Sequence, residues 1–122
     1  MKSEQWKSEP EDQDYPAAQS YLSLLMDPVE AQRLVHGLQT STALEHYKAK
    51  DILRASALAL LPEDNVHVAS DLAKVKSGKP LSPVLLVRGQ PLTIADGYHR
   101  VCASYHLAEN ADIPCRIVDP RP

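Results

Sequence analysis

The apolar run SPVLLV, residues 82–87, constrains the fold of this chain more than any other segment. An uninterrupted apolar run of this length suits a β-strand that is buried on both faces of a sheet. The turn sequence RGQP follows, and the short segment LTIA comes next, so we expect a second strand beside the first. The segment PCRIV, residues 114–118, has the length and the β-branched residues of a final strand.

Helical spacing of apolar residues characterises the segment from Tyr15 to Thr40. Asp27 followed by Pro28 is a strong helix start, because the Asp side chain can cap the helix and proline suits its first position. The apolar stripes on either side of this start predict two helices that form a hairpin over residues 15–40. Their members are Ala18, Tyr21, Leu22 and Leu25 before it, and Val29, Leu34, Val35 and Leu38 after it.

The segment from 44 to 61 shows no clear period. We expect an extended piece from Tyr47 to Ile52, followed by a helical turn that ends before Pro62. A further helix begins near Val66 and ends at Gly78. Together these elements predict an α+β protein with a single domain over residues 15–122. It consists of the hairpin and a compact core, residues 44–119, that contains a small mixed sheet with helices.

Charge is unevenly distributed along the 122 residues. Residues 1–14 carry five acidic residues against two lysines and little that could be buried, which predicts a disordered acidic tail. The rest of the chain is therefore neutral, which argues against nucleic acid as a partner, since such binding depends on clustered Lys and Arg. Cys102 and Cys115 lie in apolar surroundings, and we recognise no signal peptide and no membrane-spanning run, so we expect a cytoplasmic protein without a membrane partner.

The segment DGYHR, which begins at Asp96, lies where a predicted strand meets a predicted helix. The first backbone N–H groups of a helix are unpaired and favour an anion. Gly97 allows a ligand to approach closely, while His99 and Arg100 add donors suited to phosphate, and Tyr98 could stack on a base. The residues also allow a structural interpretation, in which Asp96 caps the helix and Arg100 pairs with an acid elsewhere.

This segment, preceded by two strands and followed by the small-residue helix VCAS, resembles the ParB/sulfiredoxin-like superfamily, mainly over residues 64–118. Members carry a similar Gly-x-x-Arg or Gly-x-His-Arg box at the same junction, against nucleotide phosphates. The resemblance implies that Gly97, Tyr98, His99 and Arg100 contact phosphate. Sulfiredoxins have their catalytic cysteine immediately before the His-Arg pair, where this chain has Tyr98, so we do not expect sulfiredoxin activity. Partition proteins append a DNA-binding domain downstream, and here the chain ends shortly after the last strand, so a partition role is not expected either.

Three charged residues outside the DGYHR segment are further candidates. On an extended piece from Tyr47 to Ile52, Lys48 and Lys50 point to one face, where they either line the phosphate pocket opposite His99 or face solvent. Should phosphate be transferred, Asp96 or Asp51 could serve as the base, and Mg²⁺ would be expected with the nucleotide.

A zinc site on the last helix is not expected. His99, Cys102 and His106 share a helix face, and Cys115 follows, but the helix is apolar around most of its circumference and no C-x-x-C pair is present.

These observations support three functional hypotheses. The first is a protein that binds a nucleotide or a phosphorylated small molecule at the strand-to-helix junction, with or without phosphoryl transfer. The second is a non-catalytic interaction module whose N-terminal hairpin docks a partner protein or a second copy of itself. The third is a DNA-associated nuclease or regulator of the same superfamily, and it is the weakest of the three because the neutral charge balance argues against DNA binding.

Overall fold

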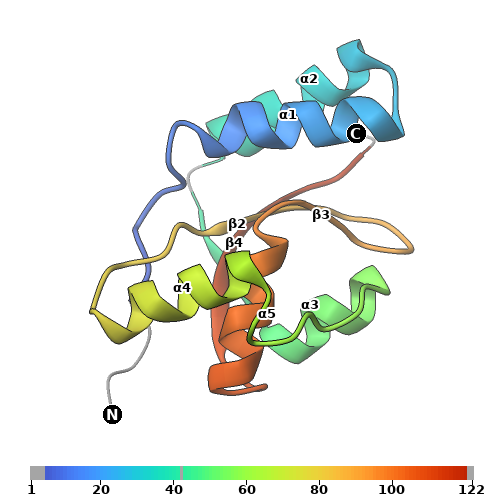
Figure 1. Ribbon diagram of the computed structural model, residues 1–122. Helices are drawn as coiled ribbons and strands as arrows, with labels where there is room; N and C mark the ends of the chain where they lie inside the picture. Colours follow the sequence, from blue (N-terminus) through green and yellow to red (C-terminus); the bar gives the residue numbers. More distant parts are fainter. Residues whose placement is uncertain (1–4, 42, 121–122) are drawn as a thin grey trace.

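The computed structural model describes residues 5–41 and 43–120 and has the predicted α+β class. Five helices and four strands follow one another along these residues (Figure 1). Their order is α1 (Asp14–Leu25), α2 (Pro28–Thr40), β1 (Glu45–Lys48), α3 (Ala49–Ser56), α4 (Val66–Lys76), β2 (Val84–Val87), β3 (Thr93–Asp96), α5 (Tyr98–Leu107) and β4 (Asp112–Val118).

The strands form one mixed sheet in the order β1-β4-β2-β3. β2 runs parallel to β4, and the two outer pairs, β1 with β4 and β2 with β3, are antiparallel. All four residues of β2 are buried, as the continuous apolar run predicts for a strand covered on both faces. Leu85 and Val87 pack on one side of the sheet, and Val84 and Leu86 pack on the other.

Helices cover both faces of the sheet, so the molecule has three layers. Figure 1 shows α1 and α2 above the sheet and α3, α4 and α5 below it. Each helical layer has its own buried cluster against the sheet: Leu22, Leu34 and Leu38 of the hairpin pack on the first face, while Ile52 and Val68 pack on the second. None of the helices in the described part of the chain has the length and apolar character that a bilayer crossing requires.

The predicted hairpin of two helices is confirmed over α1 and α2. The Asp27 carboxylate accepts a hydrogen bond from the backbone N–H of Val29 at 2.8 Å, and Pro28 occupies the first helical position, as the sequence indicates. The buried face is narrower than the apolar stripe suggests, because Tyr21 and Leu25 are exposed.

The segment around Lys48 differs from the prediction. The strand β1 ends at Lys48, and α3 begins at Ala49 in place of an extended piece that continues to Ile52. The buried residues of α3 explain the difference, since Ala49, Ile52, Leu53 and Ser56 follow helical spacing and face the core. The alternation of lysines at 48 and 50 therefore has no structural meaning as a strand pattern.

The predicted disordered tail is wrong for residues 5–14, while residues 1–4 lie outside the described part of the chain. Trp6 packs against the core cluster on the α3–α5 side and forms a parallel bridge with Leu81. The backbone N–H of Lys7 donates to the Leu81 carbonyl at 2.8 Å, and the N–H of Leu81 donates to the Gln5 carbonyl at 2.8 Å. Asp14, the first residue of α1, is buried.

Candidate functional site

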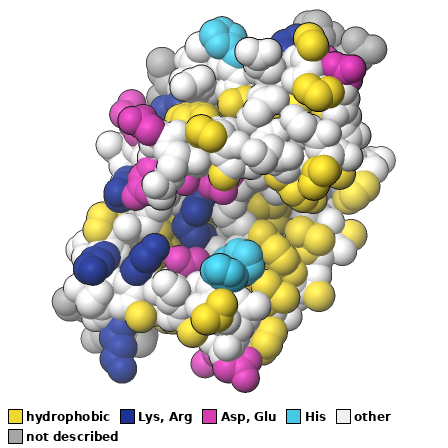
Figure 2. All heavy atoms as spheres, turned by 45° about the horizontal axis from the view of Figure 1, so that its top comes forward, with side chains coloured by type: hydrophobic (Ala, Val, Ile, Leu, Met, Phe, Trp, Pro, Cys, Tyr) yellow, Lys and Arg dark blue, Asp and Glu magenta, His cyan; other side chains and the backbone are white. Residues whose placement is uncertain are grey.

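A polar pocket of about 230 Å³ lies between α4 and the junction of β3 with α5. It brings together four of the predicted site residues: Asp96, Gly97, His99 and Arg100. Its other wall comes from α4 and consists of His67, Ser70, Asp71 and Lys74. Figure 2 shows basic, acidic and histidine side chains grouped on this face of the molecule.

Gly97 forms the bend between the strand and the helix. Its φ angle is +111°, a left-handed conformation that suits glycine, and it occupies the position before the first turn of α5. A Cβ atom at this position would lie 2.9 Å from Nη2 of Arg100 and 2.9 Å from Cγ2 of Val84. The absent side chain therefore lets the guanidinium group fold back against the backbone of the junction.

Arg100 and Asp96 form an ion pair across this bend. Nη2 of Arg100 donates to Oδ2 of Asp96 at 2.9 Å and to the Pro83 carbonyl at 3.2 Å. Only 16% of the Arg100 side chain and 18% of the Asp96 side chain are exposed. Asp96 ends β3 and does not cap the helix, so the acid that Arg100 meets is its own neighbour in the motif.

The Nε atom of Arg100 is buried and has no hydrogen-bond partner among the described residues. Guanidinium groups buried in proteins normally use their donors, since an unsatisfied donor of a charged group costs free energy. The ion pair with Asp96 therefore leaves part of the hydrogen-bonding capacity of Arg100 unused within the pocket wall.

Asp14 lies behind the pocket and links the N-terminal segment to it. Its carboxylate accepts hydrogen bonds from the Ser82 hydroxyl and, at 3.0 Å, from the backbone N–H of Glu11. Burial raises the pKa of Asp96; Arg100 lowers it, and the neighbouring Asp14 carboxyl raises it again. Sequence reasoning misses Asp14, because its place in an acidic segment gives no sign that it is buried.

The α4 wall carries three titratable side chains at a spacing of four and then three residues, which puts His67, Asp71 and Lys74 on one helix face. Nζ of Lys74 lies 3.8 Å from Oδ1 of Asp71. Burial raises the pKa of Asp71, although Lys74 and Arg100 oppose that shift. Sequence reasoning misses this wall, although the helical spacing of its three side chains indicates a shared face.

The two histidines meet across the pocket, with ring centroids of His67 and His99 4.7 Å apart. Burial lowers the pKa of His99, and His67 lowers it further. His99 therefore holds a proton less readily than an exposed histidine, and its neutral ring offers one donor and one acceptor to the pocket.

Tyr98 is not among the residues that line the pocket. Its hydroxyl group donates a hydrogen bond to the Ala59 carbonyl, and burial raises its pKa. Its ring lies 5.6 Å from the ring of His99, centroid to centroid. The residue therefore ties α5 to the segment after α3, in place of the predicted contact with a base or phosphate.

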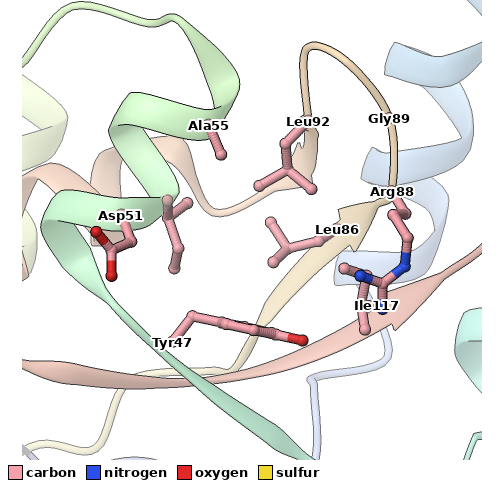
Figure 3. A pocket seen from close by; sticks show the side chains of 9 residues that line it. Tyr47, Asp51, Ala55, Leu86, Arg88, Gly89, Leu92 and Ile117 are labelled. Carbon is pink, nitrogen blue, oxygen red and sulfur yellow. The ribbon is translucent and has the colours of Figure 1, made fainter.

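Lys48, Lys50 and Asp51 lie outside the site, so the prediction that the lysines face His99 is wrong. Nζ of Lys48 lies 3.8 Å from Oδ1 of Asp112 on the neighbouring strand, and Lys50 lines a separate groove beside Tyr105. Asp51 lines another pocket, at the opposite end of the β2–β3 hairpin from Asp96 (Figure 3). The early start of α3 explains the positions of Lys50 and Asp51, which lie on this helix, whereas Lys48 is the last residue of β1.

The described residues contain no group of three His, Cys, Asp or Glu side chains placed to hold a metal ion. Cys102 is buried, and its sulfur accepts a hydrogen bond from Leu61 N–H at 3.5 Å, while His106 Nε2 lies 2.7 Å from the Leu61 carbonyl. Asp71 and Asp96 each face a cation of the pocket, Lys74 and Arg100 respectively.

Comparison with known proteins finds no matching family model, no similar curated protein and no similar solved structure. The resemblance to the ParB/sulfiredoxin-like superfamily therefore stays a prediction from the DGYHR segment.

Proposed function

We propose that the pocket at the β3–α5 junction binds the phosphate groups of a nucleotide or of another phosphorylated small molecule. The observation that carries this proposal is the Arg100 guanidinium, mostly buried, with an unused Nε donor, beside the glycine that opens α5. Phosphate oxygens match the planar fork of arginine and the free N–H groups of a helix N-terminus.

The other side chains of the pocket suit an anion with several oxygen atoms. Lys74 supplies a second cation from the facing helix, and His67 and His99 add ring nitrogens that can donate. Two acids share the pocket, but each already faces a cation, Asp71 the Lys74 ammonium and Asp96 the Arg100 guanidinium, which offsets the negative charge that a phosphate would meet. Apolar ligands fit poorly, because charged and polar side chains line almost the whole pocket.

For phosphoryl transfer, Asp96 is the remaining candidate for the base, since Asp51 lies in another pocket. Its carboxylate would take the proton from the attacking hydroxyl group as the phosphoryl group moves to that oxygen and the leaving phosphate departs. Mg²⁺ usually binds through one or two carboxylates together with the phosphates of the substrate, so it would arrive with the nucleotide, and no step is assigned to it. In this proposal binding comes first, and Asp96→Asn separates binding from turnover.

Thermal unfolding with ATP, ADP, CTP, GTP and pyrophosphate, each with and without Mg²⁺, tests the proposal. A ligand present at a hundredfold excess over its dissociation constant should add about 2.7 kcal/mol to the free energy of unfolding, which raises the midpoint by several degrees. Arg100→Lys keeps the pairing with Asp96 but loses the planar fork, so we expect a much smaller rise. Failure of all five ligands to shift the midpoint would refute the proposal.

Two lysines of α4 provide a matched comparison. Lys74 lines the pocket, whereas Lys76, the last residue of the same helix, does not. Lys74→Gln and Lys76→Gln each remove one positive charge from the same helix. Only Lys74→Gln removes a charge that lines the pocket, so it should weaken binding of pyrophosphate, whereas Lys76→Gln should leave this binding unchanged. Equal effects of the two changes would mean that only the overall charge matters.

A second candidate function, self-association through the N-terminal hairpin, rests on exposed apolar residues at the α1–α2 turn. The exposed fractions of these side chains are 43% for Tyr21, 83% for Leu24, 53% for Leu25 and 74% for Val29. Leu34 of the predicted apolar stripe is fully buried and is not part of this surface. Light scattering after size exclusion should show a concentration-dependent dimer that Leu24→Glu abolishes and Leu107→Glu, on α5, preserves. A wild-type chain that stays monomeric at every concentration would exclude this candidate.

A further inference from the structure

A second pocket, of about 250 Å³, lies at the far end of the β2–β3 hairpin from the phosphate pocket. Its walls are mostly apolar: Leu86 and Ile117 contribute from the sheet, Ile52 from α3, and Leu92 from the loop before β3 (Figure 3). The ring of Tyr47 runs along one side. Small-molecule sites have this anatomy, an apolar interior with a few polar groups that fix the orientation of the ligand.

Two groups of opposite charge stand at opposite sides of this pocket. Figure 3 shows the Arg88 guanidinium turned toward the hydroxyl end of Tyr47, with the Asp51 carboxylate across the pocket. Nε of Arg88 donates to Oδ1 of Asp119 at 2.8 Å, and the guanidinium group also interacts with the Tyr47 side chain at the pocket wall. The Tyr47 hydroxyl donates to Oε1 of Glu45 at 2.7 Å, which holds the ring in place.

The pocket is fixed by backbone contacts on both of its long sides. The N–H of Leu92 donates to the carbonyl of Ala55 at 2.8 Å and so joins the hairpin loop to α3. On the other side, Tyr47 pairs with Ile113 in the sheet. The space between these contacts is part of the folded architecture, which favours binding because little ordering is needed.

We propose that this pocket binds a compact apolar monocarboxylate, an aromatic or branched aliphatic acid. The apolar walls would enclose its ring or branched chain, and the terminal nitrogens of Arg88, beside the Tyr47 hydroxyl, would receive the carboxylate. A ligand with a second negative group is disfavoured, because that group would face Asp51. This site is separate from the phosphate pocket and does not depend on the function proposed for it.

Titration of the full-length ¹⁵N-labelled chain with phenylacetate, followed by NMR, tests this assignment. We expect saturable shifts of the amide signals of Ile52, Gly89 and Leu92. Phenylacetamide, which has the same shape without the charge, should bind about tenfold more weakly, the ratio expected for the loss of one charge-assisted hydrogen bond.

Three variants identify the groups responsible. Arg88→Gln removes the positive charge and should therefore abolish the preference for phenylacetate over phenylacetamide. Arg88 lies outside the core, so we expect the variant to fold. Ala55→Trp should block both probes by filling the pocket mouth, and its folding is checked by the unfolding midpoint. Lys48→Gln removes an exposed cation from β1 outside the pocket and should leave both affinities unchanged.

The absence of saturable shifts with either probe would overturn the assignment. An undiminished preference for phenylacetate in Arg88→Gln would overturn the role of the guanidinium and with it the choice of a monocarboxylate. If Ala55→Trp fails to fold, the comparison of Arg88→Gln with Lys48→Gln still decides.

Discussion

Nη2 of Arg100 lies 2.9 Å from Oδ2 of Asp96, four residues earlier, and the pair spans the bend where β3 becomes α5. This pair gives the DGYHR segment a structural role in addition to the one proposed for ligand binding. The same guanidinium that would hold phosphate also neutralises a buried carboxylate. A variant of Arg100 therefore changes stability as well as binding, and the two effects need separate measurements.

The first prediction concerns the stability of this pair. Arg100→Ala leaves the Asp96 carboxyl buried without its cation, so we expect the free energy of unfolding to fall by roughly 2 kcal/mol. Adding Asp96→Asn to Arg100→Ala removes the unpaired charge and should restore about half of the loss. Urea denaturation of the single and double variants measures both changes. A double variant no more stable than Arg100→Ala would show that the unpaired carboxylate is not the cause.

The second prediction compares Gly97 and Ala57, two of the three described residues with positive φ angles at helix ends. Gly97→Ala should lower the free energy of unfolding by about 2 kcal/mol, because its Cβ meets Val84 and its φ of +111° disfavours a side chain. Ala57, with φ of 57° after α3, already carries that strain, so Ala57→Gly should raise the free energy of unfolding by about 0.5 kcal/mol. Thermal and urea unfolding check both signs. Equal effects in the same direction would contradict the backbone argument.

Local chemistry made a large part of this fold predictable. The apolar run SPVLLV, the Asp27-Pro28 helix start and the strand-to-helix change at Gly97 each depend on residues that are adjacent in sequence. The pocket residues contributed by DGYHR could be named for the same reason. Tyr98 was the exception, because its direction depends on a carbonyl from the distant segment after α3.

The remaining parts depend on tertiary contacts that no local pattern specifies. The α4 wall of the pocket and the buried Asp14 come from segments far from the junction in sequence. The extended piece predicted to reach Ile52 ends at Lys48, because the residues after it bury a face that follows the helical period. The predicted tail is ordered from residue 5 because the Trp6 side chain packs on the core and its backbone forms an isolated bridge with Leu81.

The third prediction follows from the pKa of Asp71. Burial raises this pKa above its ordinary value of 3.8, so the folded protein binds the Asp71 proton more tightly than the unfolded chain does. The contribution of Asp71 to stability is thus greatest below the unfolded pKa and is lost as the pH rises through the raised folded pKa. Asp71→Asn removes that loss, so it should be more stable than wild type at neutral pH and flatten the profile above pH 3.8.

Urea denaturation from acid to neutral pH measures this profile, with Asp51→Asn as the control. Asp51 is an exposed acid near the start of a different helix, with Arg54 as its neighbour at 3.5 Å, and does not line this pocket. The difference between the Asp71→Asn and wild-type curves should grow with pH and then level off. A difference that stays constant with pH would show that the carboxyl charge is not responsible.

The fourth prediction tests whether the N-terminal segment supports the phosphate pocket. Trp6 packs on the core, and the backbone beside it pairs with Leu81. Two residues after Leu81, the carbonyl of Pro83 accepts a hydrogen bond from Arg100. Trp6→Ala removes the packing and should lower the free energy of unfolding by about 2 kcal/mol, near the lower end for a large side chain because Trp6 is only partly buried.

Because the loosened segment also carries Asp14, which raises the pKa of Asp96, the Asp96 carboxyl should titrate at lower pH in Trp6→Ala. The carboxyl ¹³C signal of Asp96, followed by NMR against pH, reports that change, and Trp6→Phe, which keeps an aromatic ring, should stay close to wild type. A loss of stability without any change in the Asp96 titration would confine Trp6 to packing and separate the segment from the site.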